Sequence, residues 1–145
     1  ASFHAGPFKQ LKKNYIDTDK VKFVFREVYF DKVGVWSSLI ARCGGQERFF
    51  GIATEIFKGQ KEWPQNDVAV ANALRKIGWE AGLSKDTVES CLADSDKINA
   101  LVEWFKDNKA RDKISSTPSL IINGQKYGNM SYDKLAALIE EQLAQ

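Results

Sequence analysis

The feature that most constrains the fold is a Thr117-Pro118 pair followed at once by the apolar segment 120–122. Proline is tolerated at the entrance of a strand, because its missing N–H then lies outside the hydrogen-bond ladder. An Asn-Gly pair comes next and predicts a type I′ turn into a second strand at 125–127. A final amphipathic helix is predicted from about Ser131. The residues around the proline leave a cis and a trans peptide bond equally open.

The N-terminal part of the chain predicts one helix and one strand. Helical spacing of apolar residues favours a helix over 6–16. The run 21–30 is rich in β-branched and aromatic residues with little alternation, which is typical of a strand covered on both faces. Arg26 and Glu27 interrupt this run, so they are expected either to form ion pairs or to lie at the end of the strand.

From about residue 36 to 108 the chain has helical periodicity throughout. Ser84 and Asp94 precede two of the predicted helices and have side chains that favour the N-cap position. The apolar residues of these predicted helices form stripes, and we interpret the stripes as the core of a helical bundle rather than as a cofactor pocket. The apolar stripes lie at 36–43, 49–57, 68–77, 84–91 and 95–105.

Length and composition limit the possible functions. The chain has 145 residues, of which 43% are hydrophobic and 28% charged, as expected for one globular domain. A net charge of +2 is too small to indicate nucleic acid as a partner. No apolar run approaches the roughly 20 residues that span a bilayer. The chain does not begin with Met and shows no signal peptide, so any leader is expected to have been removed or omitted.

The two cysteines, Cys43 and Cys91, lie far apart, and neither belongs to a CxxC motif. They are expected to be separate thiols in a cytosolic protein and a disulfide in an exported one. His4 is the single histidine, so a zinc site built from cysteine and histidine would lack ligands. No metal site is therefore predicted.

Together these elements resemble a known family. A Thr-Pro pair, strand, tight turn, strand and helix is the C-terminal half of a thioredoxin fold, in which the proline is cis and faces the active-site dithiol. The whole chain is similar to the DsbA family of bacterial thiol-disulfide oxidoreductases, and most of all to its α-proteobacterial group. The segments that carry the resemblance are 1–8 (ASFHAGPF), 22–28 (KFVFREV), 36–43 (WSSLIARC) and 121–127 (IINGQKY).

The resemblance implies an α/β fold: a thioredoxin-like fold with an inserted helical domain. The thioredoxin-like domain would comprise residues 1–32 and 114–145, and the helical insertion residues 33–113. On this reading, the N-terminal part of the sheet would be missing from this chain. We expect the central strand to be supplied by a segment before Ala1 or by another chain.

The resemblance also implies an activity, protein thiol-disulfide exchange on unfolded exported polypeptides in the periplasm. The catalytic CxxC would directly precede Ala1, so no catalytic residue is expected within the chain. Thr117 and Pro118 would bind the substrate backbone. Cys43 and Cys91 would form a structural disulfide, with two free thiols or a catalytic pair as the alternatives. No organic cofactor or metal is implied, and a membrane redox partner could recycle the dithiol.

Two other functions stay open. A redox-inactive thioredoxin-fold module would keep the peptide groove without catalysing any reaction. The given sequence fits that description because it contains no CxxC motif. Kappa-class glutathione transferases share the architecture and are the third possibility. A reductive insulin assay separates the first two functions, and glutathione binding tests the third.

Overall fold

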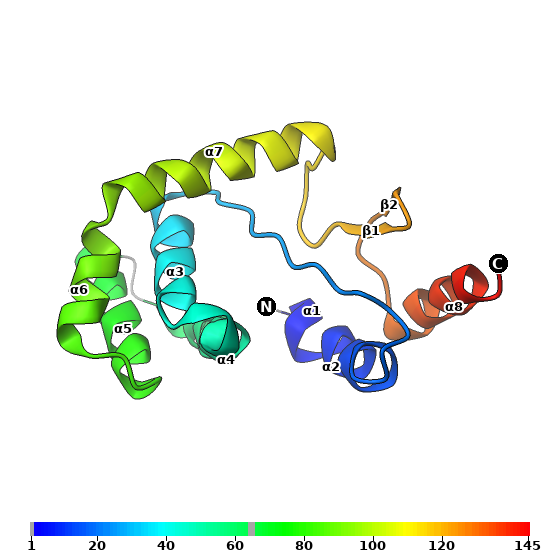
Figure 1. The fold of residues 1–145 in the computed structure, drawn as a ribbon, viewed down its shortest axis with the longest axis horizontal. Helices are drawn as coiled ribbons and strands as arrows, with labels where there is room; N and C mark the ends of the chain where they lie inside the picture. Colours follow the sequence, from blue (N-terminus) through cyan, green and yellow to red (C-terminus); the bar gives the residue numbers. More distant parts are fainter. Residues whose placement is uncertain (1, 64–65) are drawn as a thin grey trace. The chain divides into compact units, whose positions relative to one another are not determined.

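The computed structural model describes residues 2–63 and 66–145, which are mostly helical and carry one small antiparallel sheet (Figure 1). In chain order the elements are α1 (Ser2–Ala5), α2 (Pro7–Leu11), the π-helical turn η1 (Lys12–Ile16), α3 (Lys32–Cys43), α4 (Gly45–Gly59), the 3₁₀ turn η2 (Gln60–Glu62), α5 (Asp67–Glu80), α6 (Lys85–Ala93), α7 (Ser95–Arg111), β1 (Leu120–Ile122), β2 (Gln125–Tyr127) and α8 (Tyr132–Leu143).

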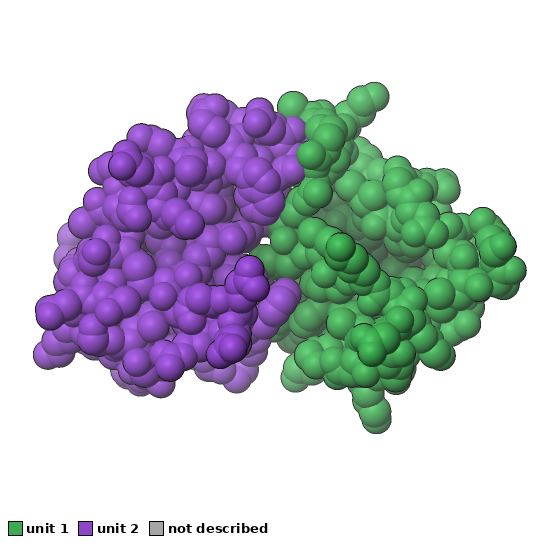
Figure 2. All heavy atoms as spheres, viewed as in Figure 1, with its two compact units in different colours: residues 1–26, 109–145 green, residues 27–108 purple. Residues whose placement is uncertain are grey.

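The chain divides into two compact units (Figure 2). Unit 1 combines residues 1–26 with residues 109–145, and unit 2 is the continuous stretch 27–108. Each unit has a hydrophobic cluster of its own. The two ends of the sequence therefore fold together, and the helical middle forms a separate core.

The core of unit 2 lies where α3, α4, α5 and α6 meet. Ile40, Leu74 and Val88 are fully buried there. Gly78 on α5 permits the close approach of α6, because a Cβ at this position would lie 2.9 Å from Val88 Cγ2. The buried members of this cluster are Ile40, Ala41, Ile52, Ala53, Ile56, Val70, Leu74 and Val88.

Side-chain caps define where the helices of unit 2 begin. Ser84 Oγ accepts from the Thr87 amide at 3.1 Å at the start of α6. Asp94 Oδ1 accepts from the Lys97 amide at 2.8 Å at the start of α7. Each cap satisfies one of the amide groups that the first turn leaves without a partner. Both N-caps predicted from the sequence are confirmed.

The core of unit 1 joins the two ends of the chain. Leu11 and Tyr15, from α2 and η1, pack with Leu135 and Ile139 of α8. The Tyr15 hydroxyl donates to Glu140 Oε1 at 2.8 Å. This bond and the burial of the ring raise the pKa of Tyr15 to about 12. The helix predicted over 6–16 is confirmed in position, although its second half is wound as a π-helix.

The predicted β-hairpin is confirmed. Leu120 pairs with Tyr127 and Ile122 with Gln125 in antiparallel register. The turn residue Asn123 has φ of 46°, and the glycine that follows it has φ of 87°. Positive φ at both central positions is what a type I′ turn requires, and an Asn-Gly pair adopts it at low cost.

The strand predicted over 21–30 is wrong for the described structure. Residues 22–29 form no regular secondary structure, and β1 and β2 pair only with each other. A β-strand exists as such only where a neighbouring strand accepts its amide and carbonyl groups. The run is also not covered on both faces, because Phe23 packs against the core of unit 1 whereas Val24 and Phe30 are exposed.

Candidate functional site

The Thr117-Pro118 loop connects the end of α7 with β1. The peptide bond between the two residues is cis, as the resemblance implied. Ser119 Oγ donates to the Ser116 carbonyl oxygen at 2.7 Å and closes the loop on itself. Thr117 is exposed and Pro118 is half-buried, so the loop lies at the surface of unit 1.

The hairpin after this loop anchors it to the core of unit 1. Leu120 and Ile122 pack on the cluster around α8, while Ile121 points the other way and is 46% exposed. Lys126 Nζ donates to the Lys113 carbonyl oxygen at 2.7 Å and ties β2 to the segment before the loop. The loop is thus held on both sides by ordered structure, as positioning of a ligand requires.

The N-terminal helices carry the single histidine of the chain. The His4 ring stacks on Phe8 with centroids 5.0 Å apart, and Phe8 in turn packs on Phe23 at 5.1 Å. His4 therefore packs against an aromatic cluster. Ala1, before which the resemblance places the CxxC motif, lies outside the described residues.

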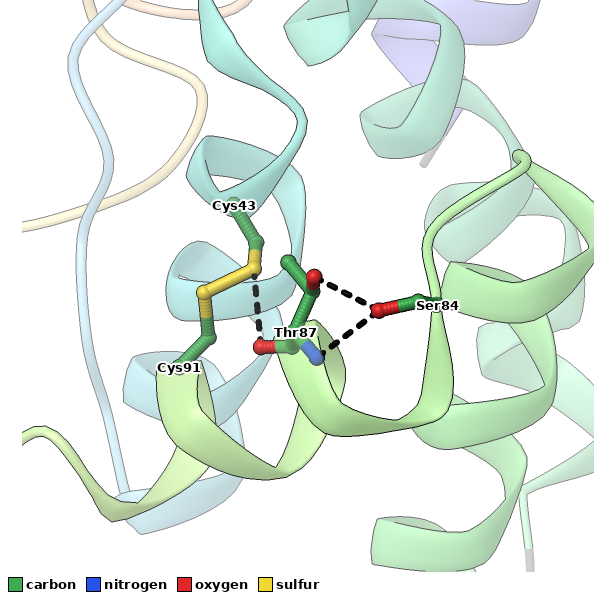
Figure 3. Close-up of a disulfide and its surroundings, with 4 residues drawn as sticks. All are labelled: Cys43, Ser84, Thr87 and Cys91. Atoms are coloured by element: carbon green, nitrogen blue, oxygen red, sulfur yellow. Dashed lines mark hydrogen bonds between the residues drawn. A yellow bond between two sulfur atoms is a disulfide. The ribbon is translucent and has the colours of Figure 1, made fainter.

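A disulfide joins Cys43, the last residue of α3, to Cys91 near the end of α6 (Figure 3). The two Cα atoms are 6.1 Å apart, a separation that a disulfide accommodates readily. Cys43 Sγ lies 3.5 Å from the carbonyl oxygen of Thr87, one turn before Cys91 on α6. Both cysteines are half-buried. They belong to unit 2, whereas Thr117 and Pro118 belong to unit 1.

Arg26 and Glu27 both form ion pairs, which is one of the two outcomes that the sequence predicted for them. Arg26 Nη1 lies 2.8 Å from Asp112 Oδ2 within unit 1. The Arg111 guanidinium, and then Arg26, hold the pKa of the Asp112 carboxyl below its usual value. Glu27 instead begins unit 2, and its Oε2 lies 2.6 Å from Arg42 Nη2.

Glu27 belongs to a polar network that sequence reasoning missed. Its Oε1 accepts from Ser38 Oγ at 2.7 Å and from Arg42 Nε at 3.1 Å. The Tyr29 hydroxyl donates to Ser38 Oγ at 2.9 Å, and burial raises the pKa of Tyr29. The Arg42 guanidinium also lies 5.5 Å from the centre of the Trp104 ring. In the sequence, Arg42 follows Ser38 at helical spacing, which could have predicted that these two side chains lie on the same helix face. Nothing in the sequence paired Arg42 with Glu27.

The described residues offer neither a metal-binding cluster nor a membrane-spanning helix. No group of three or more His, Cys, Asp and Glu side chains within 2–63 and 66–145 could hold a metal ion. In the same part of the chain, no helix has the length and apolar character needed to cross a membrane.

Comparison with known proteins fixes the family. A family model described as thioredoxin matches residues 1–141. The chain belongs to the thioredoxin family. Two relatives are named "Putative protein-disulfide oxidoreductase". The protein of Rickettsia conorii is 31% identical over 145 residues, covering 99% of this chain and 52% of the relative. The protein of Rickettsia bellii is 30% identical over 146 residues, covering 97% and 54%. The chain thus spans about half the length of these relatives.

The fold of this thioredoxin-family chain is that of DsbA structures. It matches the crystal structure of Wolbachia pipientis alpha-DsbA1 with a TM-score of 0.87 at 22% identity, over 98% of this chain and 78% of that one. A variant of the same Wolbachia protein matches with a TM-score of 0.88 at 21% identity, over the same shares. The predicted thioredoxin-like fold and the resemblance to the DsbA family are both confirmed.

Proposed function

We propose that this chain is part of a protein thiol-disulfide oxidoreductase that acts on cysteines of exported polypeptides. The match to the thioredoxin family over residues 1–141 carries this proposal. The names of the Rickettsia relatives support it. The reaction would run through a CxxC motif that the resemblance places directly before Ala1. There a helix N-terminus would stabilise the attacking thiolate.

Thr117 and Pro118 are the proposed substrate-binding residues. Thr117 is exposed, and the Ser119–Ser116 hydrogen bond and the β-hairpin hold the loop that carries it. An ordered, exposed backbone segment of this kind can bind an extended polypeptide through main-chain groups with little sequence preference. Ile121, exposed on β1, offers apolar surface close to the loop in sequence.

We propose that residues 1–32 and 114–145 form the thioredoxin-like domain and residues 33–113 a helical insertion. The two compact units, with boundaries at 26/27 and 108/109, support this division. Within the insertion, Cys43 and Cys91 would serve as a structural disulfide, because it closes a loop of 48 positions between two helices of one core.

DsbA-like proteins are typically exported and act on protein substrates. For this protein we propose a periplasmic location, unfolded or partly folded polypeptides as substrates, and a membrane redox partner that recycles the dithiol. The oxidising compartment fits the Cys43–Cys91 disulfide, because cytosolic thiols are usually kept reduced. A strand that completes the sheet would come from a segment before Ala1 or from another chain.

The test is reduction of insulin followed by turbidity, with the full-length protein and with the 145-residue chain. We expect the full-length protein to precipitate the insulin B chain faster than the buffer thiol alone. The 145-residue chain, which has no CxxC, should equal the buffer thiol. Equal rates for all three samples would instead support the redox-inactive peptide-binding module.

Glutathione binding distinguishes the remaining alternative. Calorimetric titration of the full-length protein with glutathione should give no saturable heat if it is an oxidoreductase of polypeptides. Saturable binding would favour the glutathione transferase function over the one proposed here.

A further inference from the structure

Charge is divided unevenly between the two units. Unit 1 contains eleven Lys and Arg against six Asp and Glu, a net side-chain charge of +5. Unit 2 contains ten against thirteen, a net charge of −3. The whole-chain charge of +2 therefore conceals a basic unit, and this unit carries the Thr117-Pro118 loop.

Part of this excess gathers just before the loop and in the hairpin after it. Between residues 109 and 132 the sequence has four cations and a single carboxylate, Asp112. Arg26 Nη1 lies 2.8 Å from Asp112 Oδ2, and Lys126 Nζ donates to the Lys113 carbonyl oxygen at 2.7 Å. These contacts gather four cations around one carboxylate. We call this group the basic cluster: Arg26, Arg111, Lys113 and Lys126.

The carboxylate does not cancel the basic cluster at the surface. The Asp112 side chain is 15% exposed and is paired with the guanidinium groups of Arg26 and Arg111. The side chains of these two arginines are 41% and 58% exposed. Lys113 and Lys126 are exposed, and neither forms an ion pair with a described residue. The surface therefore presents the cations, covers the anion and keeps three positive charges in excess.

The basic cluster lies close to the proposed substrate loop. Lys113 precedes Thr117 by four residues, so their Cα atoms are at most about 14 Å apart. Lys126 is the cross-strand partner of Ile121, the exposed apolar residue of β1. Side chains of directly opposite residues in an antiparallel pair lie on the same face, with Cβ atoms about 5 Å apart. A polypeptide held at the loop therefore meets apolar surface and positive charge together.

We propose that the basic cluster selects polypeptide substrates that carry Asp or Glu within about four positions of the reacting cysteine. An extended chain advances about 3.3 Å per residue, so four positions match the reach from Thr117 to Lys113. Exposed charges at the rim of a binding surface act mainly on the association rate and on the choice of partner. The inference rests on the proposed function, because only an oxidoreductase would hold such a substrate at the loop.

The experiment measures oxidation of three reduced two-cysteine peptides by the oxidised full-length protein. The peptides differ only at the positions three before and three after the first cysteine, which hold Glu, Gln or Lys. The second-order rate constant of each peptide is divided by its rate with bis(2-hydroxyethyl) disulfide, which removes differences in thiol pKa. Low ionic strength is used because salt screens the effect.

The Glu peptide should react about fivefold faster than the Lys peptide. One unit charge about 8 Å from an unmatched cation in water changes the rate about twofold, and the two peptides differ by two such steps. The Gln peptide should lie between them. The Glu-to-Lys ratio should approach one at about 1 M salt, where the Debye length is about 3 Å.

Two double variants locate the effect. Lys113→Gln/Lys126→Gln should lower the Glu-to-Lys ratio from about fivefold to about twofold, since two of the four cations remain. Lys9→Gln/Lys13→Gln removes the same charge from exposed positions of α2 and η1 in the same unit, and should keep the ratio at about fivefold. Partial unfolding of a variant lowers the rates of both peptides together, so the ratio still reports selectivity.

Equal normalised rates for the Glu and Lys peptides in the unsubstituted protein would overturn the inference and leave the proposed function standing. An equal fall of the ratio in both double variants would also overturn it, because the overall charge of the unit and not the basic cluster would then be responsible. Oxidation of none of the three peptides would overturn the proposed function, and this inference with it.

Discussion

Removal of the Cys43–Cys91 bond should cost unit 2 a large and calculable share of its stability. The bond closes a loop of 48 positions. The chain-entropy relation gives about 14 cal/mol/K for a loop of this length, or about 4 kcal/mol at 25 °C. The total stability of a domain is about 5–15 kcal/mol, so the loss should be easy to detect.

The test is urea unfolding of the Cys43→Ala/Cys91→Ala double variant, followed by tryptophan fluorescence. All four tryptophans lie within residues 27–108, so their emission reports unit 2 and not unit 1. We expect the free energy of unfolding of this transition to fall by about 3–4 kcal/mol, slightly below the entropic value because residual structure in the reduced, unfolded chain lowers the entropic gain. Wild-type protein reduced with dithiothreitol is the matched control, since it loses the bond but keeps both side chains.

Two results would refute this reasoning. A midpoint within error of the oxidised wild type would mean that the bond does not restrain the unfolded chain. A full loss of stability in the double alanine variant, with little loss in the reduced wild type, would mean that the sulfur atoms act by packing and not as a cross-link.

Three further predictions concern the two cores. Gly78→Ala should lower the stability of unit 2 by about 1 kcal/mol, because the new Cβ would lie 2.9 Å from Val88 Cγ2 and overpacking outweighs the gain in helix propensity. Gly51→Ala, with no atom within 4 Å, should instead raise it in the same urea titration, and a loss there would contradict the argument. The raised pKa of Tyr15, about 12, means that its contribution to unit 1 is complete below pH 10 and is lost as the pH rises from 10 to 12. Absorbance at 295 nm should show a tyrosine step near pH 12, and this step should be absent in Tyr15→Phe, whereas the raised titration of Tyr29 should remain. Glu27→Gln should destabilise unit 2 by about 1–2 kcal/mol, because it leaves a half-buried guanidinium without its counter-charge. An unchanged tryptophan transition would show that the pair adds nothing.

Local signals in the sequence predicted most of the helices and the hairpin. The apolar stripes gave the helix order, and Ser84 and Asp94 marked two helix starts through their capping side chains. The Asn-Gly turn predicted the hairpin because few residue pairs tolerate positive φ at two successive positions. Each of these features depends on residues close together in the chain.

Features that depend on distant residues were harder to predict. The sequence left Glu27 either in an ion pair or at the end of a strand, and its partner Arg42 lies on a helix whose orientation only the folded core determines. The run 21–30 looked like a strand because its residues are β-branched and aromatic, but strand formation requires a paired neighbour, and Val24 and Phe30 are exposed. From the sequence, the two cysteines could form a structural disulfide, stay as free thiols or act as a catalytic pair. The packing of α3 against α6 brings them together.

The most direct test of the proposed activity is turnover of a reduced, unfolded two-cysteine polypeptide by the oxidised full-length protein, measured with and without Cys43→Ala/Cys91→Ala. At a temperature where both proteins are folded, the account predicts disulfide formation in the substrate at equal rates, because the exchange chemistry resides in the proposed CxxC before Ala1. Absence of turnover in the unsubstituted protein, or its loss in the folded double variant, would contradict this account.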